Sequence, residues 1–511
     1  MLQTTSGGSN FSVLLEDQRA TSRLVIDIAN ALEPGDFVTL SGDLGAGKTT
    51  FTRALIRYLA EDQQLEVPSP TFTLLQTYDL PPFPLVHIDL FRLSNPGELT
   101  ELGLDDLPDN TVTMLEWPDR AAGLLPRDRL EIAFTLAPHL GAQARQAQVT
   151  GHGNFAARAD RIAATRRFLD GSHYANAERR RLFRDASTRS FERLLGSRSA
   201  IFMNSPPRPD GPPVRDGKPY SAIAHLAEDV KPYVAIATAL RERGFSAPEI
   251  LQADLDAGFL IMEDLGSELI VAGDPLAPMA ERYAIAVDML VALHRQQIPQ
   301  SIPVLDEGEY TIPHYDLAAY LIEVELLLDW YVPRLGDRVT PEARAAFVAL
   351  WCEALVPALA AEPKWVLRDF HSPNLLWLAH RKDIARVGLL DFQDAQIGPA
   401  AYDVASLLQD ARVNVSEELE VSLLSRYVRA RRELDHEFDP GGFTIIYATL
   451  AAQRASKILG IFARLERRDG KPEYLRHMPR VWGYLQRSLA HPALAPLNAW
   501  YKSHVPTFAG A

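Results

Sequence analysis

The sequence contains a single cysteine, Cys352, so the chain can form no internal disulfide and no thiolate metal cluster. It also has no uninterrupted apolar run of the roughly 18 residues that are needed to span a bilayer. The first residues, MLQTTSGGSN, lack the basic and apolar segments that are typical of an export signal. We therefore expect neither export nor membrane insertion, and a cytoplasmic location.

Basic charge is scarce in the first part of the chain. Residues 1–140 contain 9 Lys and Arg but 20 Asp and Glu, which gives a net charge of −11 out of −14 for all 511 residues. A protein that holds nucleic acid by itself needs a basic face to displace phosphate counterions. Any link of this part to RNA should therefore run through a partner protein.

The chain is longer than the roughly 100–150 residues of one domain, and its composition, with 47% hydrophobic and 23% charged residues, is that of a folded protein. Short β-prone runs and helical periodicity up to about residue 165 predict a compact α/β unit. The expected strands are 38–41, 85–88, 112–115 and 130–134, with helices at 48–60 and after 154. Residues 204–219, dense in proline and glycine, are expected to form a loop.

The segment GDLGAGKTT lies between a predicted strand and a predicted helix. It fits the phosphate-loop pattern, in which a glycine is followed by four residues and then by Gly-Lys-Thr. The glycines let backbone N–H groups turn toward phosphates, the lysine reaches the β and γ oxygens, and the threonine hydroxyl binds Mg²⁺. We therefore predict a site for ATP or GTP formed by Gly42, Asp43, Leu44, Gly45, Ala46, Gly47, Lys48, Thr49 and Thr50.

Three later segments, VPSPTFTLLQTY, HIDLFRL and LEWPDR, follow this loop in order. Asp89 and Glu116 each end an apolar β-like run, where an acid can bind Mg²⁺ or its waters. Both acids should therefore converge on the phosphates. We expect His87 to be a structural hydrogen bonder, and Trp117 either to pack in an apolar region or to stack on the nucleotide.

Together with the glycine loop, these segments closely resemble the bacterial TsaE family, the ATPase subunit of the system that installs threonylcarbamoyl on adenosine 37 of tRNA. The resemblance covers about the first 150 residues. It implies that Glu116 joins Thr49 at the metal, that Asp89 acts close by, and that a switch-like segment contains Thr71 and Thr73. It also implies TsaB/TsaD-type threonylcarbamoyltransferase subunits as partners, with tRNA contacted only indirectly.

A second set of chemical groups lies in the segments WVLRDFHSPNLLWL and VGLLDFQD. Asp369 is followed five residues later by Asn374, and Asp391 ends a β-like run, which is the order of kinase-like phosphotransferases. An acceptor hydroxyl needs a carboxylate to orient it and take its proton, the role that we predict for Asp369. Mg²⁺ ions on ATP need an amide oxygen and a carboxylate, predicted to come from Asn374 and Asp391.

Upstream segments fit the same arrangement. DASTRSFERL resembles a phosphate-covering hairpin, in which we expect Ser187, Thr188 and Arg189 to contact ATP. FLIMEDLG resembles the interlobe hinge of kinases, and the backbone around Glu263 and Leu265 should meet the adenine ring.

The downstream segment IGPAAYDVASLL is similar to the aminoglycoside phosphotransferase superfamily, in which Asp403 is expected to be a structural hydrogen bonder. Within it, EVELLLDWYVPRLG and QRASKILGIFARLERRDGKPEYL resemble the AmgK-type kinases of N-acetylmuramate and N-acetylglucosamine, which act in cell-wall recycling. This match covers about residues 180–490. It implies an amino-sugar substrate that is phosphorylated on its anomeric hydroxyl.

Three residues depart from the kinase pattern. Leu367 stands where these kinases usually have a backbone-organising histidine, and Asn204 stands where related sugar kinases tend to have aspartate. Met203 occupies the place of the phosphate-binding lysine of protein kinases, so another cation must hold the α and β phosphates. Arg189 and Arg193 are the candidates.

The sequence thus predicts an α/β P-loop NTPase domain followed by an α+β, two-lobed domain like those of protein kinases and aminoglycoside phosphotransferases. The expected limits are 1–160 and 181–511, with a connecting helix or linker at 161–180. We expect a bifunctional enzyme that uses ATP and Mg²⁺, an ATPase for tRNA modification fused to an amino-sugar kinase. Two alternatives stay open for the second half, a nucleotide-binding pseudokinase or scaffold, and a kinase for another small alcohol such as an aminoglycoside.

Overall fold

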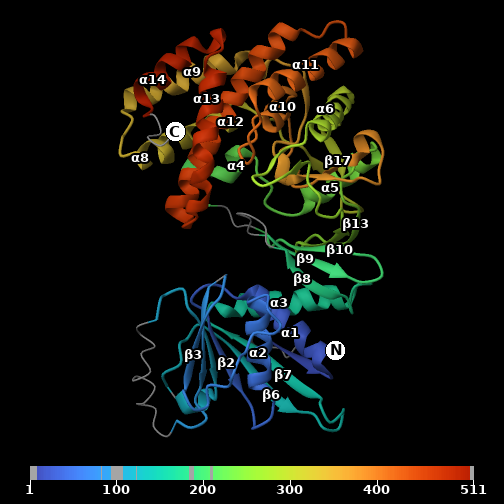
Figure 1. Cartoon of the computed structure of the whole chain (residues 1–511), viewed down its shortest axis with the longest axis vertical. Coiled ribbons are helices and arrows are strands. Elements are labelled where there is room, and N and C mark those ends of the chain that lie inside the picture. Colours follow the sequence, from blue (N-terminus) through green and yellow to red (C-terminus); the bar gives the residue numbers. More distant parts are fainter. Residues whose placement is uncertain are drawn as a thin grey trace. The chain divides into compact units, whose positions relative to one another are not determined.

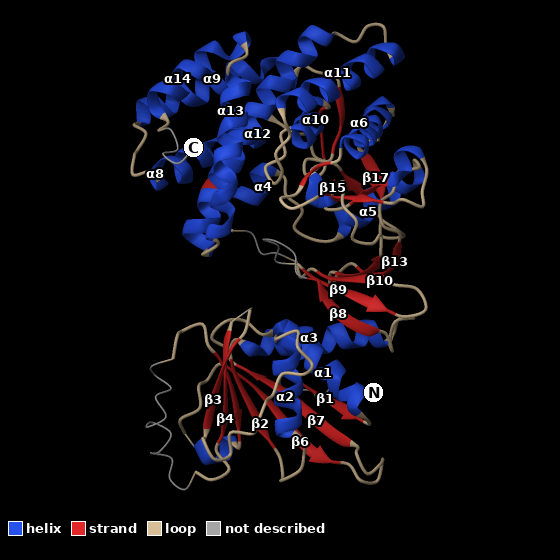
Figure 2. Ribbon diagram, viewed as in Figure 1, coloured by secondary structure: helices blue, strands red, loops and turns tan. Residues whose placement is uncertain are grey.

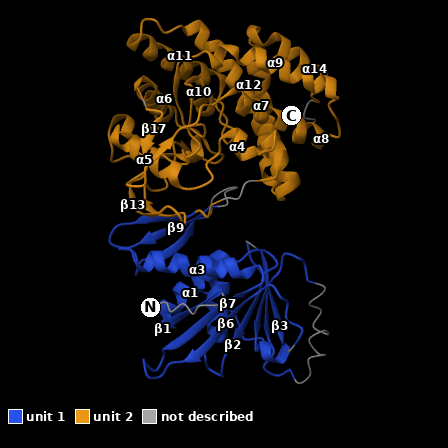
Figure 3. Cartoon of the chain, turned by 180° about the vertical axis from the view of Figure 1, so that it is seen from behind, with its two compact units in different colours: residues 1–204 blue, residues 205–511 orange. Residues whose placement is uncertain are grey.

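The computed structural model describes residues 9–81, 83–93, 107–121, 123–182, 189–207, 211–297 and 299–506. The chain divides into two compact units, Met1–Asn204 and Ser205–Ala511 (Figure 3). Unit 1 combines helices with a large sheet, whereas unit 2 is mostly helical (Figure 2). Within the described residues, no helix is both long enough and apolar enough to cross a membrane.

Unit 1 begins with alternating strands and helices and continues with runs of successive strands. The elements are β1 (Asn10–Leu15), α1 (Gln18–Ala31), β2 (Phe37–Ser41), α2 (Lys48–Leu59), β3 (Leu75–Asp79), β4 (Pro84–Asp89), β5 (Val112–Glu116), β6 (Arg129–Leu136), β7 (Arg145–His152), α3 (Phe155–Asp170), β8 (Glu178–Leu182), β9 (Ser190–Leu195) and β10 (Ala200–Asn204). All the strands and helices that the sequence predicts in this region are confirmed, with ends that differ by a few residues.

In the described part of unit 1, the first seven strands form one sheet in the order β1-β7-β6-β2-β5-β4-β3 (Figure 1). Strand β2 runs parallel to β5 and β6, and β4 runs parallel to β5. The register pairs Leu40 with Glu116 and Asp89 with Glu116. The carboxyl ends of β2, β4 and β5 therefore meet at one edge of the sheet, where the glycine loop begins.

Two apolar cores flank this sheet. Leu24 of α1, Phe51 of α2 and Val38 of β2 belong to one core, and all three are fully buried. On β4, Leu85 belongs to this core while its neighbour Val86 belongs to the second core, because successive strand residues point to opposite faces. Burial of each such side chain stabilises the fold by about 1.5–3 kcal/mol, which keeps the edge that carries the glycine loop rigid.

A buried ion-pair network fastens α3 and the β8–β9 hairpin to α1. Asp27 of α1 accepts hydrogen bonds from Arg166 of α3 and from Arg179 of β8. Arg179 also donates to Glu192 of β9, with an Nε to Oε2 distance of 2.6 Å, and Asn30 donates to the same carboxylate. All four charged side chains are buried. The helix after residue 154 is thus packed into unit 1 rather than held away from it.

Unit 2 contains β11 (Pro213–Arg215), β12 (Lys218–Pro219), α4 (Tyr220–Ala224), α5 (Lys231–Glu242), β13 (Ile250–Asp254), β14 (Phe259–Glu263), β15 (Val271–Ala272), β16 (Ala277–Pro278), α6 (Ala280–Arg295), β17 (Ser301–Pro303), β18 (Glu309–Thr311), α7 (Leu317–Leu326), α8 (Val332–Arg334), α9 (Pro341–Leu359), β19 (Pro363–Val366), β20 (Leu375–Trp377), β21 (Val387–Leu389), β22 (Gln396–Pro399), α10 (Ala401–Leu408), α11 (Glu417–Leu434), α12 (Pro440–Asp469), α13 (Met478–Leu489) and α14 (Ala495–His504). The helices pack around the long helix α12, which contacts α7, α9, α10 and α13. Strand β19 leads into the segment that contains Asp369, and the antiparallel pair β20–β21 follows it. The segment that contains Asp369 therefore lies between two short strands, β19 and β20.

One expectation for this region is wrong. Part of the predicted loop 204–219 forms a hairpin, because β11 and β12 pair in antiparallel fashion. The connecting residues Asp216 and Gly217 have φ values of 49° and 73°. Asp and Gly are residue types that tolerate this left-handed conformation, which lets the chain reverse direction within two residues.

We predict that Asp27→Asn destabilises unit 1 by about 3–5 kcal/mol. The substitution leaves two buried arginines, Arg166 and Arg179, with Glu192 as the one remaining carboxylate of the network. The matched control is Glu178→Gln, which breaks an exposed ion pair with Arg180 on the same strand and should cost at most about 1 kcal/mol. Hydrogen exchange of the α1 and β9 amides in the full chain, measured in increasing urea, reports both free energies. Equal stability of the two variants would contradict the role of the network.

Candidate active sites

The glycine loop of unit 1 joins β2 to α2 and has an unusual backbone. Gly42, Gly45 and Gly47 all have positive φ values, of 131°, 79° and 109°. A Cβ atom on Gly42 would lie 2.3 Å from the carbonyl oxygen of Phe134, so no other residue type fits there. The loop therefore requires glycine, and it ends at the N-terminus of α2, where backbone N–H groups favour a phosphate.

The side chain of Lys48 is held across this loop. Its Nζ donates to the carbonyl oxygens of Gly42 and Asp43 at 2.7 and 3.0 Å and lies 3.7 Å from the centre of the Trp117 ring. Burial lowers the pKa of Lys48, although Glu116 and other nearby carboxylates oppose this shift. Trp117 thus packs on the lysine and on Phe91, with 5.1 Å between the two ring centres. This arrangement favours the packing interpretation of Trp117.

Glu116 is the centre of a buried hydrogen-bond chain. Its Oε2 accepts from the Thr49 hydroxyl at 2.8 Å, and its Oε1 lies 2.9 Å from Nε2 of His87. His87 and Glu116 are both almost completely buried. The predicted structural role of His87 is therefore confirmed, since the ring fixes one carboxylate oxygen and leaves the other beside Thr49.

Asp89 organises the segment that precedes β3. Its carboxylate accepts from the hydroxyls of Ser69 and Thr71 at 3.1 and 2.8 Å and from the backbone N–H of Phe91 at 3.0 Å. Thr73 of the same segment is exposed. Asp89 therefore acts here as an acceptor that ties the segment around Thr71 to the end of β4.

These groups face one cavity of about 710 Å³ in unit 1, a volume typical of small-molecule sites. The predicted loop residues Leu44, Gly45, Ala46, Gly47, Lys48, Thr49 and Thr50 line it, together with Asp89 and Glu116. Arg145 of β7 also lines the cavity and donates from Nε to the Ala46 carbonyl oxygen at 3.2 Å. Arg145 was not predicted from the sequence, because it enters the site from β7, an antiparallel strand distant in the sequence.

We call residues 367–374 of unit 2 the catalytic segment, because they include the predicted base Asp369. Acids of α10 and of the residues that follow it organise this segment. Asp403 accepts from the backbone N–H groups of Leu367 and Arg368 at 2.6 and 2.9 Å, and Asp410 accepts from the Ser372 N–H at 2.7 Å. Burial raises the pKa of Asp403 to about 7, although the two N–H donors act in the opposite direction. The predicted structural role of Asp403 is confirmed. These bonds hold the backbone at Leu367 and Arg368, where the histidine of the kinase pattern is absent.

Hydrogen bonds to the backbone link the segments that contain Asp369, Asn374 and Asp391. The side-chain amide of Asn374 donates to the backbone carbonyl oxygen of Asp369 at 3.0 Å, and the Leu390 N–H donates to the backbone carbonyl oxygen of Asn374 at 2.9 Å. Because the Asn374 nitrogen is used in this way, its side-chain oxygen is the group available to a cation. The Asp369 side chain is 39% exposed, so it can reach a substrate. His371 lies beside it, with 3.9 Å between Nε2 and Oδ1 of Asp369.

The other residues predicted for the second nucleotide site are Ser187, Thr188, Arg189, Glu263 and Leu265. Ser187 and Thr188 lie outside the described residues, and Arg189 is half-buried at the start of β9. Glu263 ends β14 and pairs with Arg241 and Arg381 of its own unit, at 3.0 and 2.8 Å. Leu265 contacts β21, because its Cδ1 would lie 3.4 Å from a Cβ atom on Gly388.

Two of the residues that depart from the kinase pattern, Met203 and Asn204, lie in unit 1 at the end of β10. Met203 of β10 is buried. The side-chain oxygen of Asn204 accepts from Nε of Arg161 at 3.0 Å. Asn204 therefore has a local hydrogen-bond role within unit 1.

Two different protein families match two successive parts of the chain. Residues 15–145 match the model of the threonylcarbamoyl adenosine biosynthesis protein TsaE, and residues 178–440 match that of the phosphotransferase enzyme family. An N-acetylmuramate/N-acetylglucosamine kinase of Caulobacter vibrioides is 40% identical over 68% of this chain and 97% of its own length. The corresponding kinase of Pseudomonas aeruginosa is 32% identical over 61% of this chain and 85% of its own length. The tRNA threonylcarbamoyladenosine biosynthesis protein TsaE of Rickettsia bellii is 39% identical over 25% of this chain and 88% of its own length.

We predict that Asp403→Asn loosens the catalytic segment. Asparagine presents an NH₂ group to one of two N–H donors, so one buried donor loses its partner at a cost of about 1–3 kcal/mol. Hydrogen exchange in the full chain should therefore be faster at Leu367 and Arg368. The control is Asp306→Asn in an exposed turn, which should leave that exchange unchanged. Unaltered protection of these amides in Asp403→Asn would contradict the assigned role.

Proposed function

The chain belongs to the TsaE family through residues 15–145 and to the phosphotransferase enzyme family through residues 178–440, and we propose on this basis that it performs two separate ATP-dependent tasks. The first is that of the ATPase subunit in tRNA threonylcarbamoylation at adenosine 37. The second is transfer of a phosphoryl group from ATP to the anomeric hydroxyl of N-acetylmuramate or N-acetylglucosamine. The domain limits that we propose are 1–160 and 181–511, joined by 161–180.

The cavity of unit 1 supports the first task. Its glycine loop and the N-terminus of α2 suit the phosphates of a nucleotide, and Lys48 can exchange the Gly42 and Asp43 carbonyls for phosphate oxygens. The Thr49 hydroxyl and the Glu116 carboxylate, 2.8 Å apart, form the pair of oxygen ligands that Mg²⁺ accepts beside phosphates. The donor set therefore fits a Mg²⁺–nucleotide complex, with Asp89 fixing the adjoining segment.

We further propose that this part reaches tRNA only through TsaB/TsaD-type threonylcarbamoyltransferase subunits. Its net charge of −11 over residues 1–140 repels a polyanion. Partner subunits that hold the tRNA would remove the need for a basic surface here.

The single observation that supports the kinase task best is that hydrogen bonds to the backbone link the segments of Asp369, Asn374 and Asp391 in unit 2. In this proposal Asp369 orients the sugar hydroxyl and takes its proton, while Asn374 and Asp391 hold Mg²⁺ against the ATP phosphates. The oxygen donors fit the ion, which neutralises phosphate charge during transfer. Retention of all three groups is unexpected for a pseudokinase or scaffold.

We predict that Lys48→Ala in the full chain abolishes support of tRNA threonylcarbamoylation, because the variant lacks the cation that reaches the β and γ phosphates. The assay combines the chain with TsaB/TsaD-type subunits, tRNA and ATP. Sugar phosphorylation by the same variant should stay within about twofold of wild type, since Lys48 lies only in the unit 1 cavity. Undiminished tRNA modification by Lys48→Ala would refute the first task.

We predict that Asp369→Asn lowers kcat for sugar phosphorylation by about 10²- to 10⁴-fold with little change in ATP affinity, because it removes the base. Asp391→Asn should in addition weaken Mg²⁺–ATP binding, and Asp306→Asn serves as the unaffected control. The measurement is ³¹P NMR of products formed from ATP and a panel of amino sugars, aminoglycosides and other small alcohols. Absence of any sugar 1-phosphate with the wild-type chain would reject the second task.

A further inference from the structure

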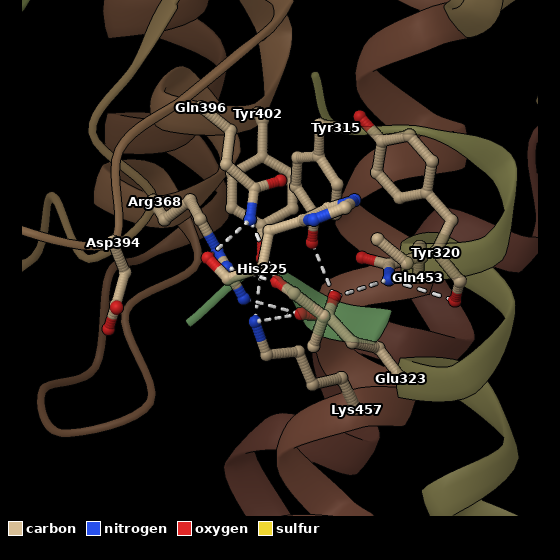
Figure 4. A network of polar contacts seen from close by, with 12 residues as sticks. His225, Tyr315, Tyr320, Glu323, Arg368, Asp394, Gln396, Tyr402, Gln453 and Lys457 are labelled. Carbon is tan, nitrogen blue, oxygen red and sulfur yellow. Dashed lines mark hydrogen bonds and ion pairs between the residues drawn. The ribbon is translucent and has the colours of Figure 1, made fainter. Parts of the chain in front are cut away.

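A cluster of buried polar side chains surrounds Glu323 of α7 (Figure 4). The Glu323 carboxylate is completely buried and accepts hydrogen bonds from the Tyr315 hydroxyl and from Nε2 of Gln453, the latter at 2.9 Å. It also pairs with Nζ of Lys457 at 2.9 Å and with Nη2 of Arg368. Four donors from three parts of the chain thus meet on one carboxylate.

Arg368 connects this cluster to the proposed catalytic base, because it directly precedes Asp369. Its guanidinium donates to the Ala224 carbonyl oxygen at 3.0 Å as well as to Glu323. Its backbone has a φ of 66°, a conformation that costs free energy in a residue with a side chain. The backbone of Arg368 is held by Asp403 and Ser406, and its side chain by Glu323 and the Ala224 carbonyl. These contacts together stabilise the residue that directly precedes Asp369.

The charges of the cluster are strongly coupled. Burial opposes ionisation of Glu323, yet Lys457 and Arg368 outweigh it and hold the pKa of the carboxyl below its usual range. Burial and Arg368 oppose the charge on Lys457, but Glu323 and the tyrosines beside it raise the pKa of this lysine overall. Glu323 is the largest favourable interaction of Arg368 and also raises the pKa of Lys457, so it stabilises both cations.

The two segments that distinguish the sequence within its superfamily supply this cluster. EVELLLDWYVPRLG begins with Glu323, and QRASKILGIF contains Gln453 and Lys457. Gly460 of the same helix lets α12 approach α7 closely, because a Cβ atom there would lie 2.4 Å from the Leu326 carbonyl carbon. The close approach brings both donors of α12 within reach of Glu323, so the two segments act together.

We propose that Glu323 is a positioning residue of the kinase reaction, which anchors the Arg368 side chain and thereby fixes the orientation of Asp369. This proposal rests on the proposed sugar-kinase function. Asp403 holds the backbone N–H of Arg368 from α10, and Glu323 holds its side chain from α7. The base is thus located from two sides by groups that do not touch the substrate.

The test replaces Glu323 by glutamine, which keeps the shape of the side chain and removes its charge. Misplacement of a reacting group by about 1 Å costs about 10²-fold in rate, so we expect kcat of Glu323→Gln to fall by about that factor. The fall should be equal for N-acetylmuramate and N-acetylglucosamine, and KM for each sugar should stay within about threefold of wild type, since no binding contact is lost.

Glu325→Gln is the matched control. Glu325 lies two residues further on the same helix, is also buried and pairs with Arg215 and Arg344, neither of which adjoins the catalytic segment. This variant should retain the wild-type kcat. If Glu323→Gln does not fold, the double variant Glu323→Gln/Lys457→Met removes one charge of each sign and should show the same loss of kcat.

A wild-type kcat in either Glu323 variant overturns the proposal. A rise in KM for the acidic sugar N-acetylmuramate alone also overturns it, because the cluster would then bind the substrate carboxylate directly. Hydrogen exchange separates this proposal from the proposed function, since it needs no acceptor. If the wild-type chain phosphorylates no sugar, faster exchange at Leu367 and Arg368 in Glu323→Gln than in Glu325→Gln still supports the positioning role, and equal exchange overturns it.

Discussion

A buried carboxylate is stable only when several hydrogen-bond donors or cations surround it, and this requirement shapes both proposed nucleotide sites. Glu116 is held by His87 and Thr49 at the end of β5, and Asp403 is held by two backbone N–H groups of the catalytic segment. In each case the hydrogen-bond donors belong to the segments that form the site. The hydrogen bonds that stabilise the buried carboxylate therefore also fix the positions of the residues that form the site.

Much of the first site could be predicted from the sequence because its determinants are local. A glycine loop between strand and helix has one stable form, and parallel strands bring Asp89 and Glu116 to the same edge. Arg145 could not be found in this way, because the antiparallel register of β7 brings it to the loop. The β11–β12 hairpin was missed because proline and glycine weigh against strands, although Asp216-Gly217 is a turn sequence.

The second site shows the same limit more clearly. The spacing of Asp369, Asn374 and Asp391 identifies kinase chemistry, since each group must meet ATP, metal or acceptor. The segments that contain Glu323 and Lys457 could be recognised as distinctive, but nothing in their local pattern shows that they meet. That contact depends on the packing of α7 against α12, which long-range burial decides. Residues in compact sequence motifs were thus predictable, whereas contacts made by packing between distant segments, such as those of Arg145 and Glu323, were not.

The central claim is that one chain contains two separate Mg²⁺–ATP sites, one formed by the glycine loop of unit 1 and one that requires Asp391 of unit 2. Calorimetric titration of the full chain with a non-hydrolysable ATP analogue and Mg²⁺ tests this claim most directly. We expect two molecules of analogue bound per chain, with affinities that differ because the two sets of phosphate contacts are unrelated. Saturation at one molecule per chain would contradict the account, whichever site remained occupied.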